Sequence, residues 1–288
     1  MERLYGYKIF WWYSNMIKWI LLLISIVLLF IMKKKRHFLS IQAIFKNEAM
    51  NFKEYIEHYL WQGVDHFYFI DNGSDDNYME VIKPYMSKIT LFKRPEKYKQ
   101  VDHMNEVFNK IRHESEWFMM IDLDEFCYES SGNSNIKEYL KSLSPNVSQV
   151  YLRMLMFVSR DEYEHPESIR KAFTWREKDI CMGAGKAIIK SDKTKSFGVH
   201  NFDTDGETII ETDKLHFNHY RLQSKEYFDK VKKTRGDVNT IDFENVRDDN
   251  YFTSNDKREY EDTQLRDILM NKIQHTKPAQ NNGQPLDS

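Results

Sequence analysis

Residues 116–126 read Glu-Trp-Phe-Met-Met-Ile-Asp-Leu-Asp-Glu-Phe, an apolar run that ends in three acids. The run 117–121 has no polar alternation, which is typical of a strand buried on both faces of a parallel sheet. Open α/β sheets bind their ligands at the carboxyl ends of such strands. Because side chains alternate along an extended chain, we expect Asp122 and Asp124 to point the same way, and Leu123 to point into the core.

Two carboxylates on one side of a strand end suit a hard divalent ion. Mg²⁺ or Mn²⁺ held by one or two carboxylates keeps open positions for substrate phosphates, whose charge it neutralises. The alternative is a solvated acidic turn without a function, which is the usual interpretation of a bare Asp-x-Asp. The buried strand before the pair, and Glu125, Phe126 and Tyr128 close behind it, favour a functional site.

The composition is that of a folded protein without a field that would attract nucleic acid. The chain has 288 residues, of which 41% are hydrophobic and 15% aromatic, enough for one large domain or two small ones. Its 42 basic residues balance 44 acidic ones, for a net charge of −2. Two cysteines, Cys127 and Cys181, make neither a disulfide framework nor a zinc motif, and we expect free thiols.

The N-terminal region predicts a membrane anchor. After a tail of residues 1–9, residues 10–32 are mostly apolar and carry aromatic residues at their start, as in an interfacial belt. A cleaved signal peptide fits poorly, because the basic cluster 33–36 follows the apolar run and no small-residue cleavage site is visible. We therefore expect an uncleaved single-pass helix.

Strands and helices alternate between this anchor and the acidic strand end. We expect strands at 38–45, 66–70 and 89–92, with helices from about Phe52 to Gly63, at 78–85 and at 101–111. Such alternation implies a parallel sheet with helices on both faces. No Gly-x-Gly-x-x-Gly follows the first strand and no phosphate-binding P-loop motif occurs, so neither an ordinary dinucleotide fold nor a P-loop is indicated.

A second predicted strand also ends in acidic residues. Residues 71–76 read Asp-Asn-Gly-Ser-Asp-Asp directly after the strand 66–70. An aspartate there can accept hydrogen bonds from a ribose or a base, although Asn-Gly-Ser by itself is ordinary turn chemistry.

The second half of the chain is rich in strands that we expect to be antiparallel to the first half. They are predicted at 147–158, 185–190, 196–200, 208–211 and 214–220, with helices at 136–143 and 224–235. A lone histidine is more often a packed core residue than a ligand, yet His200 at a strand end could complete a metal site begun by carboxylates. Residues 241–288 form a polar extension whose end, 274–288, we expect to be disordered.

Four ordered motifs resemble the GT-A glycosyltransferases of the family 2-like and family 92 type. They are residues 44–48 with 55–59, 63–67, 70–75 and 117–126, and a later segment containing His219-Tyr220-Arg221, Ser224, Lys230 and Arg235-Gly236 is similar to the C-terminal signature of the same group. The resemblance covers about residues 40–240. It implies a GT-A domain over 38–240, a Rossmann-like mixed sheet with an antiparallel-rich second half, and a hexosyltransferase that uses a nucleotide-sugar, foremost a UDP-sugar, with Mn²⁺ or Mg²⁺.

The resemblance also assigns roles to individual residues. The implied donor-binding residues are Asn47, Glu48, Asp71, Gln100, Asn105 and Asp122, and the implied metal ligands are Asp122, Asp124 and His200. Asp71 would contact the nucleoside. The sequence departs from the broader family 2 pattern at Asn72, where a second aspartate is usual.

The implied chemistry needs a base for the acceptor hydroxyl, whether the acceptor is a glycan, a lipid or a protein. A metal that bridges both phosphates would stabilise the diphosphate leaving group, and in an inverting displacement a carboxylate on the opposite side takes the proton. Inversion is implied by the resemblance. Asp124 and Glu125 are the candidate catalytic residues, and the sequence leaves the base open among Glu125, Asp161, Glu162, Asp203 and Asp205.

Two alternatives and one question of topology remain open on the sequence. A haloacid dehalogenase-type phosphatase also uses Asp-x-Asp after a buried strand, but there the motif sits on the first strand. A non-catalytic, membrane-anchored protein that binds a sugar nucleotide or a glycan is the second alternative. The positive charges after the span favour a cytosolic catalytic domain over a lumenal one, as does the glycosylation sequon 72–74, because a glycan there would obstruct the donor site.

Overall fold

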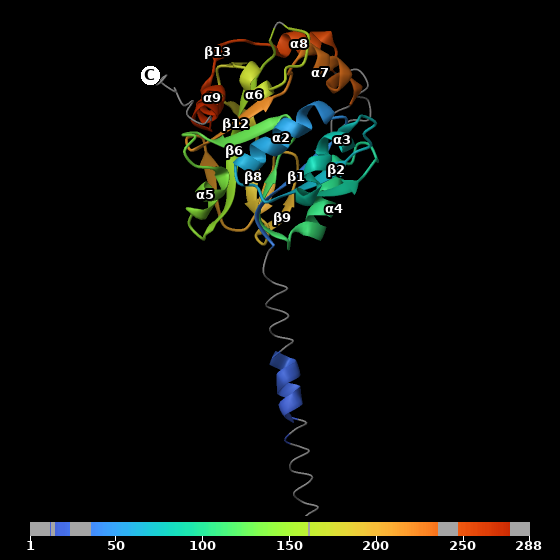
Figure 1. Cartoon of the computed structure of the whole chain (residues 1–288), viewed down its shortest axis with the longest axis vertical. Helices are drawn as coiled ribbons and strands as arrows, with labels where there is room; N and C mark the ends of the chain where they lie inside the picture. Colours follow the sequence, from blue (N-terminus) through green and yellow to red (C-terminus); the bar gives the residue numbers. More distant parts are fainter. Residues whose placement is uncertain (1–11, 13–14, 24–35, 161, 236–246, 277–288) are drawn as a thin grey trace, which may run out of the picture.

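The computed structural model of the chain describes residues 12, 15–23, 36–160, 162–235 and 247–276 (Figure 1). The predicted tail 1–9 and most of the predicted span 10–32 lie outside these residues. Within the described residues, no helix combines the length and the apolar character that a bilayer crossing requires.

Parallel strands form the first half of the main sheet. β1 (His37–Phe45) pairs with β2 (His66–Asp71) on one side and β4 (Ser115–Met120) on the other, and β3 (Ile89–Lys93) follows β2. The register pairs Phe45 with Asp71, so the carboxyl ends of β1 and β2 meet at one edge of the sheet. The predicted alternation of strands and helices is therefore confirmed in this half.

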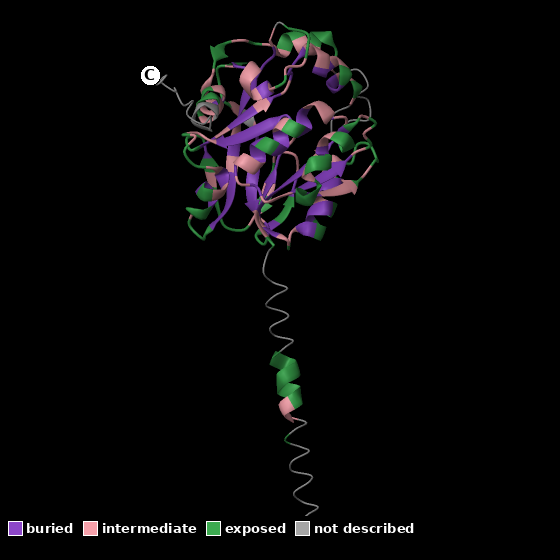
Figure 2. Ribbon diagram, viewed as in Figure 1, coloured by how far each residue is buried: buried purple, intermediate pink, exposed green. Residues whose placement is uncertain are grey.

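Side chains of β4 enter two layers of the core alternately. Trp117 and Met119 pack in the layer under α2 (Ala49–Trp61), whereas Phe118 and Met120 pack in the layer under α4 (Gln100–Ile111). The strand is buried on both faces, as Figure 2 shows for the sheet as a whole. This double burial explains why its sequence lacks a polar alternation.

The helix α2 ends where the sequence predicts. Gly63 has φ of +87°, a left-handed conformation that costs glycine little. An added Cβ would lie 2.7 Å from Lys137 Cβ of the short helix α5 (Ile136–Lys141), so the position also needs a residue without a side chain. The helices α3 (Tyr78–Ile82) and η1 (Lys83–Lys88) fill the connection between β2 and β3.

The second half of the sheet mixes strand directions. β8 (Cys181–Lys190) runs antiparallel to β4 and to β6 (Val147–Phe157), and β12 (Leu215–Tyr220) runs antiparallel to β5 (Glu125–Glu129) but parallel to β6. The remaining elements here are β11 (Glu207–Glu211) beside β6, the two-residue β7 (Trp175–Arg176), α6 (Ile169–Ala172), and a separate pair of β9 (Thr194–Phe197) and β10 (Phe202–Thr204). The mixed α/β sheet is confirmed.

The fold continues past residue 240, where the sequence analysis ends the domain. After α7 (Lys225–Lys230) and η2 (Lys232–Thr234) come α8 (Asp249–Asn255), β13 (Tyr260–Glu261) and α9 (Gln264–Thr276). β13 pairs with β7, and Leu265 of α9 is buried. Polar composition hid these elements, since they are held by backbone pairing and a few apolar anchors. Residues 277–288 of the predicted tail lie outside the described residues.

Two stacked histidines at the amino ends of β1 and β2 make the stability of this fold depend on pH. The rings of His37 and His66 lie 4.7 Å apart at 9°. Burial, followed by the proximity of His37, lowers the pKa of His66 from 6.5 to about 4. Between these two pH values the unfolded chain binds a proton that the folded chain does not, so the stability falls as the pH is lowered.

We therefore expect the free energy of unfolding to decrease from pH 7 to pH 4.5, and His66→Gln to flatten that decrease. Urea unfolding at both pH values measures it. His113→Gln, at an exposed histidine, is the control and should keep the wild-type slope. A slope equal to wild type in His66→Gln would show that this histidine does not titrate in the expected range.

Candidate functional site

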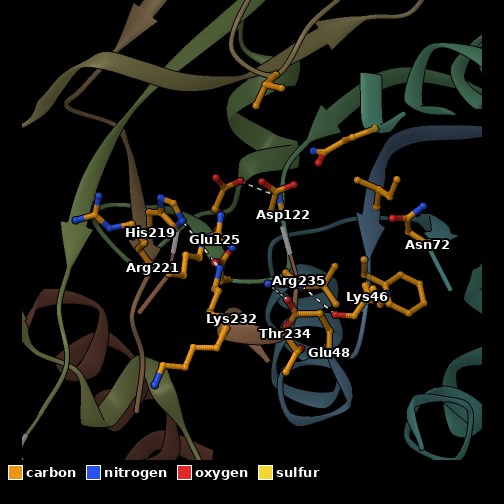
Figure 3. Close-up of a pocket in the computed structure, with 18 of the residues that line it drawn as sticks. Lys46, Glu48, Asn72, Asp122, Glu125, His219, Arg221, Lys232, Thr234 and Arg235 are labelled. Carbon is orange, nitrogen blue, oxygen red and sulfur yellow. Dashed lines mark hydrogen bonds and ion pairs between the residues drawn. The ribbon is translucent and has the colours of Figure 1, made fainter. Parts of the chain in front are cut away.

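A cavity of about 580 Å³ opens at the carboxyl ends of β1 and β4, and residues of the C-terminal segment that contains α7, η2 and α8 also line it. In Figure 3 the acids Asp122 and Glu125 lie between Asn72 on one side and His219 and Arg221 on the other. The charged residues of the lining are the acids Glu48, Asp122, Asp124 and Glu125 and the bases Lys46, Lys97, Arg221, Lys232, Lys233, Arg235 and Arg247. Because bases outnumber acids, the cavity suits an anionic ligand.

Asp122 is the most accessible of the strand-end acids. Its side chain is 32% exposed, and its carboxylate accepts a hydrogen bond from Lys186 Nζ at 2.8 Å. Lys186 comes from β8 and is almost fully buried. Burial alone would lower the pKa of Lys186, but Asp122 and Glu125 outweigh it and the pKa is raised. Lys186 is therefore a fixed positive charge beneath the acidic turn.

Asp124 is far less accessible than Asp122, although the sequence predicts that both side chains point the same way. Its side chain is 4% exposed and forms an ion pair with Lys232 of η2, while His219 Nε2 lies 3.5 Å from its Oδ2. Burial would raise the pKa of Asp124, but Lys232 and His219 outweigh it and hold the pKa well below its usual range. The two aspartates are thus bound by different cations. As expected, Leu123 between them is buried in the core.

Glu125 begins β5 directly, so the acidic turn joins two buried strands. One of its carboxylate oxygens accepts the Asp122 backbone N–H at 2.7 Å. The other oxygen, Oε1, is buried and has no hydrogen-bond partner among the described residues. Burial raises the pKa of Glu125 well above its usual range. A carboxyl group with one unsatisfied oxygen beside a cavity is equipped to exchange a proton with a ligand.

Glu48 lines the cavity, but its carboxylate is used inside the protein. Arg235 Nη2 lies 2.5 Å from it, and Tyr227 Oη and Asn51 Nδ2 both donate hydrogen bonds to it. Arg235 Nη1 also donates to the Lys46 carbonyl oxygen at 3.0 Å. This network ties the turn after β1 to the C-terminal segment and closes one wall of the cavity.

Three of the predicted donor-binding residues lie outside the cavity lining. Asp71 accepts hydrogen bonds from Ser74 N in its own turn and from Tyr78 Oη at the start of α3. Asn47 accepts one from Asp75 N. The side-chain amide of Asn105 donates to the carbonyl oxygen of Phe197 and accepts from its backbone N–H. These two hydrogen bonds fix the end of β9 against α4. These three residues shape the loops around the site, whereas the predicted Glu48, Gln100 and Asp122 do line it.

Asn72, which replaces the usual aspartate, lines the cavity with a fixed orientation. Its amide nitrogen donates to the carbonyl oxygens of Arg94 at 2.5 Å and Glu96 at 3.0 Å. A carbonyl oxygen can only accept, so the amide nitrogen must face that loop. The side-chain oxygen of Asn72 is left as the acceptor, and Figure 3 shows this residue at the far side of the cavity from Arg221.

The three predicted metal ligands do not form a metal site as they stand. His200 lines the cavity, and its Nδ1 lies 2.9 Å from the Gly185 carbonyl oxygen, so Nδ1 carries the proton and Nε2 keeps its lone pair. The Asp122 carboxylate is accessible, but the Asp124 carboxylate is buried in an ion pair with Lys232. Across the described residues, no group of three His, Cys, Asp or Glu side chains is arranged to hold a metal ion.

Of the residues left open as a catalytic base, Glu125 is the one that lines the cavity. Glu162 pairs with Arg160 and Asp205 pairs with Lys195, both on exposed loops. Asp203 lies on β10, outside the lining, and Asp161 lies outside the described residues. Sequence reasoning missed Lys186 and Lys232, because lysines 60 or more positions away give no local signal of a contact with these acids.

Comparisons with known proteins show which family the chain matches. The family model described as glycosyltransferase family 92 matches residues 35–268. A glycosyltransferase family 92 protein of Oryza sativa subsp. japonica is 26% identical over 123 residues, which are 41% of this chain and 21% of that protein. The match thus spans about a fifth of the relative's length.

Two solved structures match this chain with low sequence identity and low TM-scores. S. aureus TarS in complex with UDP superposes with a TM-score of 0.39 and 10% identity, over 67% of this chain and 62% of that one. A glycosyltransferase involved in the glycosylation of the major capsid of PBCV-1 gives a TM-score of 0.27 and 16% identity, over 54% of this chain and 60% of that one.

The pair of Glu48 and Arg235 should contribute strongly to stability. Glu48→Gln keeps the shape of the side chain but leaves the Arg235 guanidinium without its counter-charge, and loss of one partner of a buried pair costs about 3–5 kcal/mol. We expect a loss of unfolding free energy of that order, measured by urea unfolding.

Glu106→Gln is the matched control, because Glu106 pairs with Arg94 and Lys110 at an exposed position and should not measurably change the unfolding midpoint. A Glu48→Gln variant as stable as Glu106→Gln would show that the network does not tie the C-terminal segment down.

Proposed function

Because the chain belongs to glycosyltransferase family 92, we propose that it transfers a sugar from a nucleotide-sugar donor to an acceptor hydroxyl within the 580 Å³ cavity. One observation carries the proposal: the acids at the end of β4 and seven Lys and Arg side chains line one cavity of ligand size. Cations of this kind suit a diphosphate, and a carboxyl group suits the acceptor hydroxyl.

The donor lies along the cavity with its base near Asn72 and its diphosphate near the basic wall. The lining of the same cavity includes the uncharged Ile44, Tyr98 and Gln100 and also Lys97, which follows the Glu96 carbonyl that Asn72 contacts. The fixed side-chain oxygen of Asn72 needs a donor from the base. Uracil offers N3–H for this contact, and we propose a UDP-sugar as the donor.

The basic residues stabilise the departing diphosphate. Lys46, Arg221 and Lys233 line the cavity with partly exposed side chains and can reach phosphate oxygens without breaking a buried pair. As the bond to the sugar breaks, negative charge grows on the diphosphate, and positioned cations stabilise that charge more than they stabilise the intact donor.

Glu125 takes the proton of the acceptor hydroxyl. Its Oε1 is unsatisfied and its pKa is raised by burial, which gives the carboxylate form a higher proton affinity than that of an exposed glutamate. Asp122 donates its backbone N–H to the other oxygen and so orients the carboxyl group. A direct displacement with this base inverts the sugar's anomeric centre.

The proposal also includes the predicted anchor over 10–32 and a cytosolic catalytic domain. The basic cluster 33–36 supports this orientation, and so does Asn72, because its amide nitrogen is bonded within the cavity wall and a glycan on it would obstruct the donor. Protease treatment of sealed vesicles distinguishes the two orientations, since a domain that resists digestion until detergent is added faces the lumen.

A donor screen tests the activity directly. We expect the purified protein with Mn²⁺ to release UDP from at least one UDP-sugar, and Asp122→Asn to lower that rate by about 100-fold or more. Asp122→Asn leaves the buried Lys186 with Glu125 at 3.8 Å as its remaining carboxylate, so we expect a less stable variant, and urea unfolding checks that it is folded under the assay conditions.

Asp102→Asn, at an exposed position of α4 outside the lining, is the control and should keep the wild-type rate. An absence of UDP release with every donor, or an Asp122→Asn variant of undiminished rate, would contradict the proposal.

A further inference from the structure

Tyr98 lines the cavity from the loop 94–99, which joins β3 to α4. We propose that the face of its ring stacks on the base of the bound nucleoside diphosphate, while Asn72 contacts the edge of that base. The inference rests on the proposed function, because it requires the cavity to bind a nucleotide. It assigns much of the affinity for the base to an uncharged loop residue that lies outside the four family motifs.

The backbone of Tyr98 is strained. Its φ of +60° lies in the left-handed region, which a bulky side chain rarely adopts. Such a conformation is costly and persists only where the surrounding structure enforces it, and strained residues of this kind gather at ligand sites. A relaxed φ would turn the Tyr98 side chain in another direction relative to the loop. The strain therefore indicates a constraint on where this ring points.

Hydrogen bonds fix the loop on both sides of Tyr98. Before it, the Glu96 carbonyl oxygen accepts from Asn72 Nδ2 at 3.0 Å and from His103 Nε2 at 3.1 Å. After it, the Lys99 carbonyl oxygen accepts from the His103 backbone N–H at 2.9 Å, at the start of α4. Because both neighbouring segments are held, the backbone of Tyr98 cannot relax without breaking one of these contacts.

The side chain of Tyr98 is not used inside the protein. It is 39% exposed, and across the described residues it forms no hydrogen bond, ion pair or ring contact. A strained backbone is ordinarily offset by the contacts of the side chain that it positions. Here the described part of the chain supplies no such contact, and the ring borders the cavity. The ring is therefore available to a ligand.

A bound base needs a contact to its face as well as one to its edge. The edge carries the hydrogen-bonding groups, and the side-chain oxygen of Asn72 is proposed to accept from one of them. The two faces of the base are flat and aromatic, and stacking one of them on an aromatic side chain contributes about tenfold in affinity or more. Asn72 bonds the carbonyl two residues before Tyr98, so both contacts lie at the same end of the cavity.

Isothermal titration calorimetry of the full chain with UDP tests the inference. We expect Tyr98→Ala to weaken UDP binding by about tenfold, and Tyr98→Phe, which keeps the ring, to bind UDP within about twofold of wild type. Inorganic pyrophosphate has no base, so its affinity should be the same for Tyr98→Ala and for wild type.

Tyr98→Gly separates the effect of the ring from that of the backbone. Glycine adopts a φ of +60° without strain, so we expect Tyr98→Gly to unfold at a higher urea concentration than Tyr98→Ala. Both variants lack the ring, and both should bind UDP equally weakly. If the loss of affinity came only from a distorted loop, Tyr98→Gly would recover it.

Tyr163→Ala is the matched control, since Tyr163 is 55% exposed and lies outside the cavity lining. It should keep the wild-type affinity for UDP. Unchanged UDP affinity in Tyr98→Ala, or wild-type affinity in Tyr98→Gly, would overturn the inference and leave the proposed function standing. A wild-type protein that binds no UDP would contradict the proposed function itself, and this inference with it.

Discussion

The buried negative charge of Asp124 is the constraint on which the rest of the site depends. The apolar strand β4 crosses the core and ends at an acidic turn in which Asp124 and Glu125 have almost no access to water. Taking a carboxylate out of water costs several kcal/mol unless a cation accompanies it. Lys232 meets that need from more than 100 residues further along the chain, and so the C-terminal segment must fold back over the end of the sheet.

The same segment is fixed a second time by Glu48 and Arg235. These two ion pairs join the turns after β1 and β4 to η2 and the residue that follows it, and the cavity is the space enclosed between them. Because both pairs exclude water, the cations and acids that face the cavity interact more strongly than they would on an open surface. The same charged residues therefore contribute to the stability of the fold and line the proposed ligand site.

The sequence predicts the parallel half of the fold well because its signals are local. The continuous apolar run 117–121 predicts a buried strand, and Gly63 predicts the end of a helix. Each prediction depends on only a few neighbouring residues. The strand-end position of Asp122 followed from the same reasoning. The sequence did not predict the contacts between distant segments, namely Lys186 with Asp122 and Lys232 with Asp124. It also did not predict the folded elements after residue 240. The donor contacts that the resemblance implies for Asp71, Asn47 and Asn105 stay predictions, and in the structure their side chains bond the backbone of nearby loops.

The central claim is that the acidic strand end and the C-terminal segment together form one nucleotide site. Hydrogen–deuterium exchange of the protein with and without UDP measures both parts in a single experiment. The account predicts slower exchange in the turn 121–126 and in the segment 225–235 at the same UDP concentration. Protection confined to one of these segments, or protection that avoids both, would contradict it.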